Sequence, residues 1–151
     1  MTKDSRGTNV DERLYKSIIG SLLYLTASIP YIAFAVGICA RYQSCPKNNH
    51  LGSTKRIIKY VNGTSGYGLL YTLNTSSSLV DYYDAYWVAS SDDRKSTSGG
   101  CFFLGNNLIS WFSKKQYCVF LSTTEAKYVV VGSSCTQLLW IRQMLMKYDV
   151  S

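Results

Sequence analysis

The chain has 151 residues, of which 46% are hydrophobic, 17% are charged and only 2 are proline. This is the composition of a globular protein long enough to bury a core, and it excludes intrinsic disorder, collagen-like repeats and low-complexity sequence. Lys and Arg together number 16 against 9 Asp and Glu, so the formal net charge is +7. A positive charge of that size favours a polyanionic partner such as nucleic acid, although it indicates nothing about the fold.

The five cysteines predict an intracellular protein. Their number is odd, no CxxC pair occurs among them, and the first residues do not have the pattern of a secretory leader. Disulfide frameworks are typical of secreted proteins with paired cysteines. We therefore expect free, mostly buried thiols in a reducing compartment, the cytoplasm or the nucleus, and no secretion.

The first part of the chain has the apolar spacing of helices. From Asp11 onward, apolar residues recur every three or four positions and predict one helix with a buried stripe. That stripe comprises Leu14, Ile18, Leu22 and Leu25. A second helix is expected from residue 30 to about residue 42. A third is expected from about residue 46 to residue 61, where Asn62 and Gly63 end it because both residue types tolerate positive φ.

Residues 17–40 contain no charged side chain, and this length is enough to span a bilayer as a helix. Pro30 in the middle of the run, polar Ser21, Thr26 and Ser28, and similar numbers of basic residues at both ends argue against a spanning helix. Two buried helices packed as a hairpin explain the run equally well. A small membrane protein built on residues 17–40 is kept as an alternative to a chain without a membrane segment.

After Gly66 the apolar period changes from helical to two, which is typical of strands. We expect strands over residues 67–71, 79–88, 100–104 and 108–112, and one more strand or its edge over residues 117–121. The residues between the third and fourth strands, Gly105, Asn106 and Asn107, predict a tight hairpin turn, because Asn accepts the left-handed conformation.

A long helix is predicted to follow the strands. Ser122 is a favourable N-cap and Glu125 stands three residues later, which together make a capping box. Its expected buried stripe comprises Lys127, Val131, Leu138, Ile141 and Leu145. The predicted fold class is therefore α+β, with about three helices followed by an antiparallel sheet covered by one long helix. The boundary between the two parts is expected near residues 63–66, which gives segments 1–65 and 66–151.

Asp84 stands out because it lies within a predicted strand, where Asp is disfavoured. One explanation is a charged residue that faces solvent or an edge. The other is a ligand for a metal ion. The residue and its spacing alone do not decide between the two.

The sequence around and beyond Asp84 contains several further motifs. In chain order they read Y-D-A-Y-W-V, D-D-R-K-S-T-S-G, I-S-W-F-S-K-K-Q and S-T-T-E-A-K-Y, with K-R-I-I-K-Y-V-N-G-T upstream. These motifs, in this order, strongly resemble the end of copia-type retrotransposon Pol polyproteins. The resemblance covers about residues 12 to 148, nearly the whole chain.

The resemblance implies that residues 1–65 are the helical tail of a reverse transcriptase and that residues 66–151 are the first part of a ribonuclease H-like domain. In that family, acidic residues hold two magnesium ions that hydrolyse the RNA strand of an RNA–DNA hybrid. Magnesium prefers several converging oxygen ligands, so a single carboxylate does not suffice. The family's last core aspartate lies on a strand after the long helix, and we expect this chain to be truncated before it.

The chain departs from the family pattern at its acidic positions. Asp84 matches the first acid, and Tyr86 stands where the family has a second Asp. Glu125 matches the first Glu of the family's E-A-E-Y motif, and Lys127 replaces the second.

Residues 125 and 127 point about 200° apart on a helix, and position 127 continues the predicted buried stripe toward the sheet. We therefore assign the metal-facing role to position 127 and a structural cap to Ser122 and Glu125. An ammonium at 127 repels magnesium and is expected to pair with Asp84 instead. Asp84 is then the remaining, weak metal position, and we expect no bound magnesium.

Four basic residues flank the predicted strands near this site: Arg94, Lys95, Lys114 and Lys115. They predict a nucleic-acid-binding surface, because Lys and Arg near phosphates give sequence-independent affinity. The alternative is an ordinary solvated face.

The leading hypothesis is a degenerate, catalytically inactive fragment of a copia-type Pol polyprotein. Its expected partners are an RNA–DNA hybrid or other nucleic acid, and the rest of a Pol polyprotein. The alternatives are a non-catalytic basic nucleic-acid-binding module and the small membrane protein.

Overall fold

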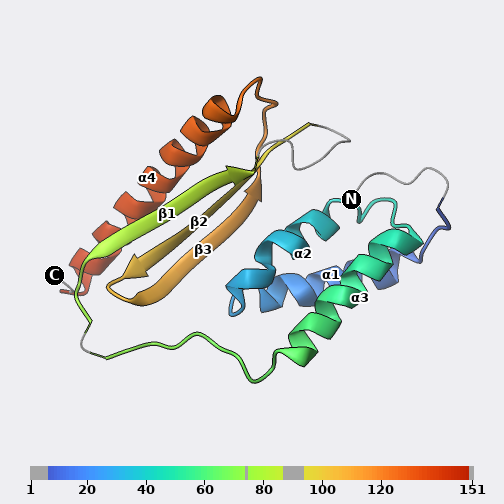
Figure 1. Ribbon diagram of the computed structural model, residues 1–151, viewed down its shortest axis with the longest axis horizontal. Coiled ribbons are helices and arrows are strands. Elements are labelled where there is room, and N and C mark those ends of the chain that lie inside the picture. The colour runs from blue at the N-terminus through green and yellow to red at the C-terminus, as the bar shows by residue number, and fades with distance from the viewer. Residues whose placement is uncertain (1–6, 74, 87–93, 150–151) are drawn as a thin grey trace. The chain divides into compact units, whose positions relative to one another are not determined.

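Helices come first and strands second in the computed structural model, which describes residues 7–73, 75–86 and 94–149 (Figure 1). The contacts divide the chain into two units, one that extends to Gly68 and one that begins at Leu69. The first unit holds helices, and the second holds an antiparallel sheet with one long helix. The predicted α+β class is therefore confirmed. The assignment of residues 1–65 and 66–151 to two parts of a polyprotein stays a prediction.

The helical unit contains three α-helices and one short 3-10 helix among the residues described. They are α1 (Glu12–Leu25), η1 (Pro30–Ile32), α2 (Ala33–Ala40) and α3 (Asn48–Gly63). The second helix of the prediction thus starts as a 3-10 turn at Pro30, where proline's fixed φ suits the first helical position. The uncharged run of residues 17–40 is divided between α1, η1 and α2. No helix in the described part of the chain has both the length and the apolar character that crossing a bilayer requires.

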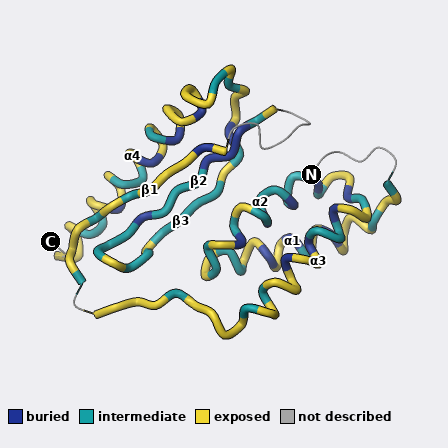
Figure 2. The backbone as a smooth tube through the Cα atoms, in the orientation of Figure 1, coloured by how far each residue is buried: buried dark blue, intermediate teal, exposed yellow. Residues whose placement is uncertain are grey.

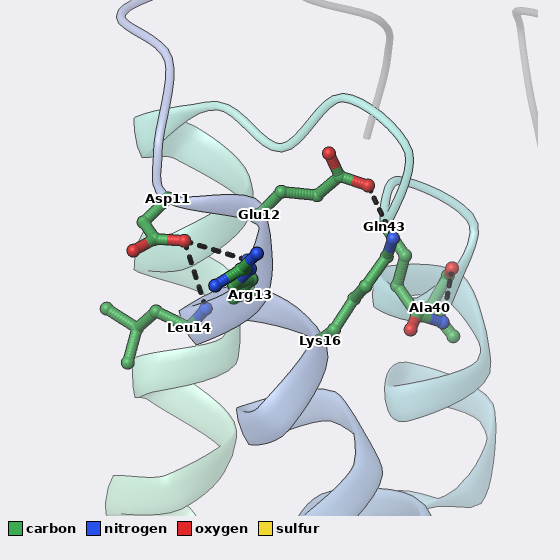
Figure 3. A network of polar contacts seen from close by, with 7 residues as sticks. All are labelled: Asp11, Glu12, Arg13, Leu14, Lys16, Ala40 and Gln43. Carbon is green, nitrogen blue, oxygen red and sulfur yellow. Dashed lines mark hydrogen bonds and ion pairs between the residues drawn. The ribbon is translucent and has the colours of Figure 1, made fainter.

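The start of α1 is fixed by its N-cap, Asp11 (Figure 3). The Asp11 carboxylate accepts hydrogen bonds from the backbone N–H groups of Arg13, at 2.8 Å, and Leu14, at 3.3 Å. These donors have no partner inside the helix, so the cap stabilises the first turn. One turn further, Glu12 forms an ion pair with Lys16 on the exposed side of the helix.

The core of the helical unit is built from one face of each helix. Its buried residues are Tyr15, Ile19, Leu22, Ile32, Val36, Cys39 and Ile57. The hydroxyl of Tyr15 donates a hydrogen bond of 2.9 Å to the carbonyl oxygen of Cys39, which ties α1 to α2. The predicted stripe was wrong at Leu14, which is 52% exposed, because the buried face is centred on Tyr15 and Ile19 instead. Ile18 and Leu25 pack at the margin of this core.

The sheet of the second unit has the strand order β1-β2-β3, with both neighbouring pairs antiparallel. Its strands are β1 (Leu79–Tyr86), β2 (Thr97–Leu104) and β3 (Asn107–Lys115). The hairpin turn between β2 and β3 was predicted correctly, but Gly105, with φ +57°, takes the left-handed conformation that was assigned to Asn. Residues 87 and 88 of the second predicted strand, and the two aspartates of the D-D-R-K motif, lie outside the described residues.

Two expected strands are not strands. Residues 67–71 and 117–121 have no ladder partner in the described part of the chain. The first segment docks on the β2–β3 hairpin through side chains. Tyr71 donates to the carbonyl of Leu108, and the amide of Asn107 bonds both the N–H and the C=O of Thr72. The side chain of Asn107 therefore provides the pairing that the sequence pattern had suggested for a backbone ladder.

Helix α4 (Thr123–Lys147) packs along the sheet mainly on β1 (Figure 1). The residues on its buried face are Ala126, Val130, Ser134 and Ile141, and Figure 2 shows this line of buried positions along the helix. The predicted stripe was therefore wrong by one residue at its first two positions, because Lys127 is exposed and Val131 is only half-buried, but Ile141 is buried as predicted. The buried positions that the prediction missed, Ala126, Val130 and Ser134, hold smaller side chains than the leucines of the predicted stripe.

The cysteines are free, as expected, but most of them are not buried. Cys39 is buried and Cys101 is half-buried, whereas Cys45, Cys118 and Cys135 are exposed. Burial raises the pKa of the Cys39 thiol to about 11, so this thiol stays protonated and inert at neutral pH.

The turn at Gly105 gives a test of the hairpin. In Gly105→Ala, the new Cβ would clash with the hydroxyl of Thr75 and the carbonyl of Ser76, and φ would stay in a region that L side chains rarely adopt. We expect the free energy of unfolding to fall by about 1–3 kcal/mol, measured by chemical denaturation. In the control Gly132→Ala the Cβ meets open space on α4, and we expect a gain of about 0.5–1 kcal/mol. Equal stability of the two variants would contradict the left-handed turn.

Candidate functional site

The acidic position singled out by the sequence, Asp84, lies on β1 opposite Gly99 of β2. Lys127, in the first turns of α4, places its Nζ 3.9 Å from Oδ1 of Asp84. The pairing expected from the sequence is therefore confirmed, although Lys127 is not on the buried stripe of α4, where the prediction had placed it. The Lys127 side chain is 63% exposed and reaches Asp84 from the margin of the buried face of α4.

This ion pair adds little to stability, and it places a positive charge beside the oxygen that a metal ion would approach. The Asp84 side chain is 81% exposed, so water screens the attraction between the two charges. A cation approaching Asp84, however, meets an ammonium already beside the carboxylate. Oδ1 of Asp84 also accepts a 2.8 Å hydrogen bond from the N–H of Ala85. This hydrogen bond occupies a lone pair of Oδ1 that a metal ion would otherwise use.

The donor set that the described residues place at Asp84 does not fit magnesium. Among the described residues, no group of three or more His, Cys, Asp or Glu side chains is placed to hold a metal ion. Magnesium prefers octahedral oxygen coordination with one or more carboxylates and its own waters. A single exposed carboxylate with a lysine 3.9 Å away offers neither the charge nor the ligands.

The second acid of β1, Asp81, was not singled out by the sequence. Its Oδ2 accepts a 2.9 Å hydrogen bond from the hydroxyl of Ser134 on α4. This bond links the sheet to the helix, so Asp81 has a structural role. The available signal was Ser134, a serine within an apolar helical pattern and four residues before the predicted stripe residue Leu138. Sequence reasoning did not use it.

The capping box predicted at the start of α4 is present in a shifted form. The hydroxyl of Ser122 accepts a hydrogen bond from the N–H of Glu125 at 3.2 Å. The carboxylate of Glu125 accepts from the N–H of Leu121 at 2.9 Å, one residue before the usual partner. Both residues therefore have the structural role that was assigned to them.

The four basic residues lie at one end of the sheet. Lys114 and Lys115 end β3, and they are opposite Ser98 and Thr97 at the start of β2. Arg94 and Lys95 immediately precede that start, and Arg94 is exposed. The antiparallel register therefore brings together basic residues that are about twenty positions apart in the sequence. Asp84 belongs to the same end, since it pairs with Gly99.

A pocket of about 420 Å³ lies beside this basic end, between the sheet and α4. Its lining residues are Ser98, Phe102, Ser110, Trp111, Phe112, Lys114, Lys115, Gln116, Tyr117, Val129, Ser133 and Gln137. The Lys114 ammonium lies 5.3 Å from the centroid of the Tyr117 ring, a cation–π distance. Sequence reasoning noted the S-K-K-Q motif but not that Lys114, Lys115 and Gln116 border a pocket.

Gln116 of this pocket joins the sheet to α4. It is buried, and its Nε2 donates hydrogen bonds of 3.0 Å to the hydroxyl of Ser98 and to the carbonyl of Ala126. Its Oε1 has no hydrogen-bond partner among the described residues. The Ala126 carbonyl requires a donor, which fixes the orientation of the amide.

Comparison with known proteins gives several relatives. The Pol polyprotein from transposon RE1 of Arabidopsis thaliana is 37% identical over 140 residues, which are 93% of this chain and 10% of that protein. The Pol polyprotein from transposon TNT 1-94 of Nicotiana tabacum is 36% identical over 145 residues, which are 95% of this chain and 11% of that protein. The chain thus spans about a tenth of the length of these relatives.

A shorter relative matches over most of its own length. The protein named secreted RxLR effector protein 161 of Plasmopara viticola is 37% identical over 128 residues, which are 84% of this chain and 90% of that protein. No protein-family model matches the chain, and no solved structure matches it significantly.

The cap and the charge pair are expected to differ in their effect on stability. Ser122→Ala removes the acceptor for the N–H of Glu125, and we expect the free energy of unfolding to fall by about 1 kcal/mol. Lys127→Ala removes only an exposed ion pair, and we expect a change below about 0.5 kcal/mol. Urea denaturation of both variants measures the difference. A larger loss for Lys127→Ala than for Ser122→Ala would show that the pair holds α4 in place.

Proposed function

This chain belongs to the copia-type retrotransposon Pol polyproteins. From that premise we propose that it carries a ribonuclease H-like region whose metal site is disarmed, that is, unable to bind magnesium. In this proposal the helical unit is the tail of the reverse transcriptase region. The order of the motifs along the chain supports the assignment, together with a sheet followed by one covering helix. The chain acts as a non-catalytic part of a Pol polyprotein.

The observation that carries the proposal is the 3.9 Å separation of the Lys127 ammonium and the Asp84 carboxylate. Metal-assisted hydrolysis of a phosphodiester needs a bound cation to activate water and to stabilise the leaving oxygen. At this site the positive charge is the ammonium of Lys127, which does not coordinate and activate a water molecule as a metal ion does. An ammonium also opposes the entry of a divalent cation, because both are positive.

The neighbouring positions do not restore the missing ligands. Tyr86 replaces an acid of the family pattern two residues after Asp84. Asp81 is engaged by Ser134, and Glu125 is engaged by the helix cap. Each of the described acids near the start of α4 therefore already has a structural partner.

A second role, nucleic-acid binding, is favoured by the four basic residues at one end of the sheet. Their clustering by the strand register gives a local positive field on a chain of net charge +7. Such a surface binds a phosphate backbone without reading bases, and an RNA–DNA hybrid suits recognition by shape. Binding of this kind does not require magnesium.

The disarmed site predicts no magnesium-dependent cleavage of an RNA–DNA hybrid by the full chain. In Lys127→Glu, a second carboxylate stands beside Asp84, and we expect Mn²⁺ binding to appear in electron paramagnetic resonance titrations. The control Lys147→Glu makes the same charge change at the far end of α4 and should not gain this binding. The double variant Asp84→Asn with Lys127→Glu should lose it.

Two outcomes would contradict the disarmed site. One is hybrid cleavage by the unaltered chain that Asp84→Asn abolishes. The other is Mn²⁺ binding that is the same in Lys127→Glu and Lys147→Glu, which would show that position 127 does not control the site.

Nucleic-acid binding predicts a salt dependence. In fluorescence anisotropy with a labelled RNA–DNA hybrid, we expect the logarithm of the binding constant to fall linearly with the logarithm of the salt concentration. Arg94→Gln should make the slope shallower by about 0.9, the value for one lost phosphate contact. Arg142→Gln, an exposed position on α4, is the control and should leave the slope unchanged. A binding constant that does not change with salt concentration would contradict this role.

A further inference from the structure

We propose that the outer face of α3 is a separate binding surface, which holds the phosphate backbone of a double-stranded nucleic acid without reading its sequence. Its charged residues are Lys55, Arg56 and Lys59, and we call this surface the α3 face. It belongs to the helical unit, whereas the basic residues at the end of the sheet belong to the second unit. The proposal therefore stands whether or not the sheet end binds.

Most of the positive charge of the chain lies in its helical part. Residues 1–68 contain nine of the sixteen basic residues but only three of the nine acidic ones, a net charge of +6. Residues 69–151 contain seven basic and six acidic residues, a net charge of +1. Because an excess of one sign attracts a polyanion, the helical part is where the sequence favours such a partner most.

The three cations of the α3 face are exposed and are not neutralised. Helix α3 contains no acidic residue, and none of the three cations forms an ion pair in the described part of the chain. The described acids of the helical unit, Asp11 and Glu12, are engaged at the start of α1, one as its cap and the other with Lys16. The charge of the α3 face is therefore available to a ligand.

The cations lie on the side of α3 that points away from the core. Each residue turns a helix by about 100°, so the residues of the α3 face fall within an arc of about 100°, and Gly52 falls in the middle of that arc. The buried residues of α3 lie on the opposite side, and they are His50, Thr54 and Ile57. The helix thus presents one continuous positive surface to solvent.

Helix stability does not explain this arrangement. Lys55 and Lys59 are four residues apart, where two like charges repel and destabilise a helix. Basic residues stabilise a helix when they lie in its last turn, but the last turn of α3 has none. Gly52 also weakens the helix, although a Cβ at this position would meet open space. A polyanion relieves the repulsion between the lysines, so the charges that weaken the free helix favour binding.

A double helix is the polyanion that suits the α3 face best. Lys and Arg beside phosphates give affinity that does not depend on the bases. Surfaces for single strands stack unpaired bases on aromatic side chains, and the α3 face has none within its arc. The exposed apolar and aromatic residues of α3, Ile58 and Tyr60, lie outside the arc, so the cations are not combined with the apolar anchors of a membrane-binding helix.

The variant Gly52→Glu separates binding from folding. Its carboxylate lies three residues before Lys55 and four before Arg56, from where it pairs with these cations and stabilises the helix. We expect the thermal midpoint of unfolding to rise by about 2–4 °C, measured by circular dichroism. Affinity for a labelled DNA duplex, measured by fluorescence anisotropy with the full chain, should fall roughly tenfold, the order expected for one lost phosphate contact. The control Gly52→Gln has the same size without the charge and should keep the affinity.

The salt dependence identifies the contacts. Lys59→Gln should make the slope of the logarithm of the binding constant against the logarithm of the salt concentration shallower by about 0.9. Lys16→Gln makes the same charge change on α1, at a lysine paired with Glu12, and should leave the slope unchanged. Arg94→Gln reports on the sheet end, so either surface can fail while the other binds.

Four results would overturn the proposal. One is that the unaltered chain does not bind the duplex, and another is equal duplex affinity in Gly52→Glu and Gly52→Gln. The third is tighter binding of a single strand of the same length than of the duplex. The last is binding to vesicles that contain phosphatidylserine, lost in Gly52→Glu, at protein concentrations where the duplex is not bound, which would make the α3 face a membrane contact.

Discussion

The packing of α4 on β1 decides where the chemistry of the second unit lies. Ala126 and Val130 pack against Ala85 of β1, and Ser134 bonds Asp81 on the same strand. These contacts fix the rotation of the helix about its own axis. Each residue turns a helix by about 100°. The residue directly after a buried position and the residue directly before it therefore lie on opposite flanks of the buried face.

The two flanks have different characters. Lys127 follows Ala126 and reaches Asp84, whereas Val129 and Ser133 precede the buried positions and line the pocket. A rotation by one residue would bury the Lys127 ammonium against the sheet, at the large cost of an unpaired buried charge. The small residues of the buried face thus keep the lysine in water and place it at the margin, where it meets the carboxylate.

Gln116 connects the pocket to this same packing. One of its donors goes to the carbonyl of Ala126 in the first turn of α4, and the other goes to Ser98 of β2. A side chain directly after β3 therefore holds both the sheet and the helix, and its Oε1 is buried without a hydrogen-bond partner in the described part of the chain.

The sequence by itself determined the order and kind of most elements, because capping residues, turn residues and apolar periods are local signals. The caps at Asp11 and Ser122 and the hairpin at Gly105 are of this type. It also determined which acid was replaced by Lys127, through the resemblance of the motifs. Tertiary structure alone decided that Asn107 pairs with residue 72 in place of a strand, that small residues form the inner face of α4, and that Gln116 borders a pocket. Those outcomes depend on contacts between residues distant in the chain, which a periodic pattern does not encode.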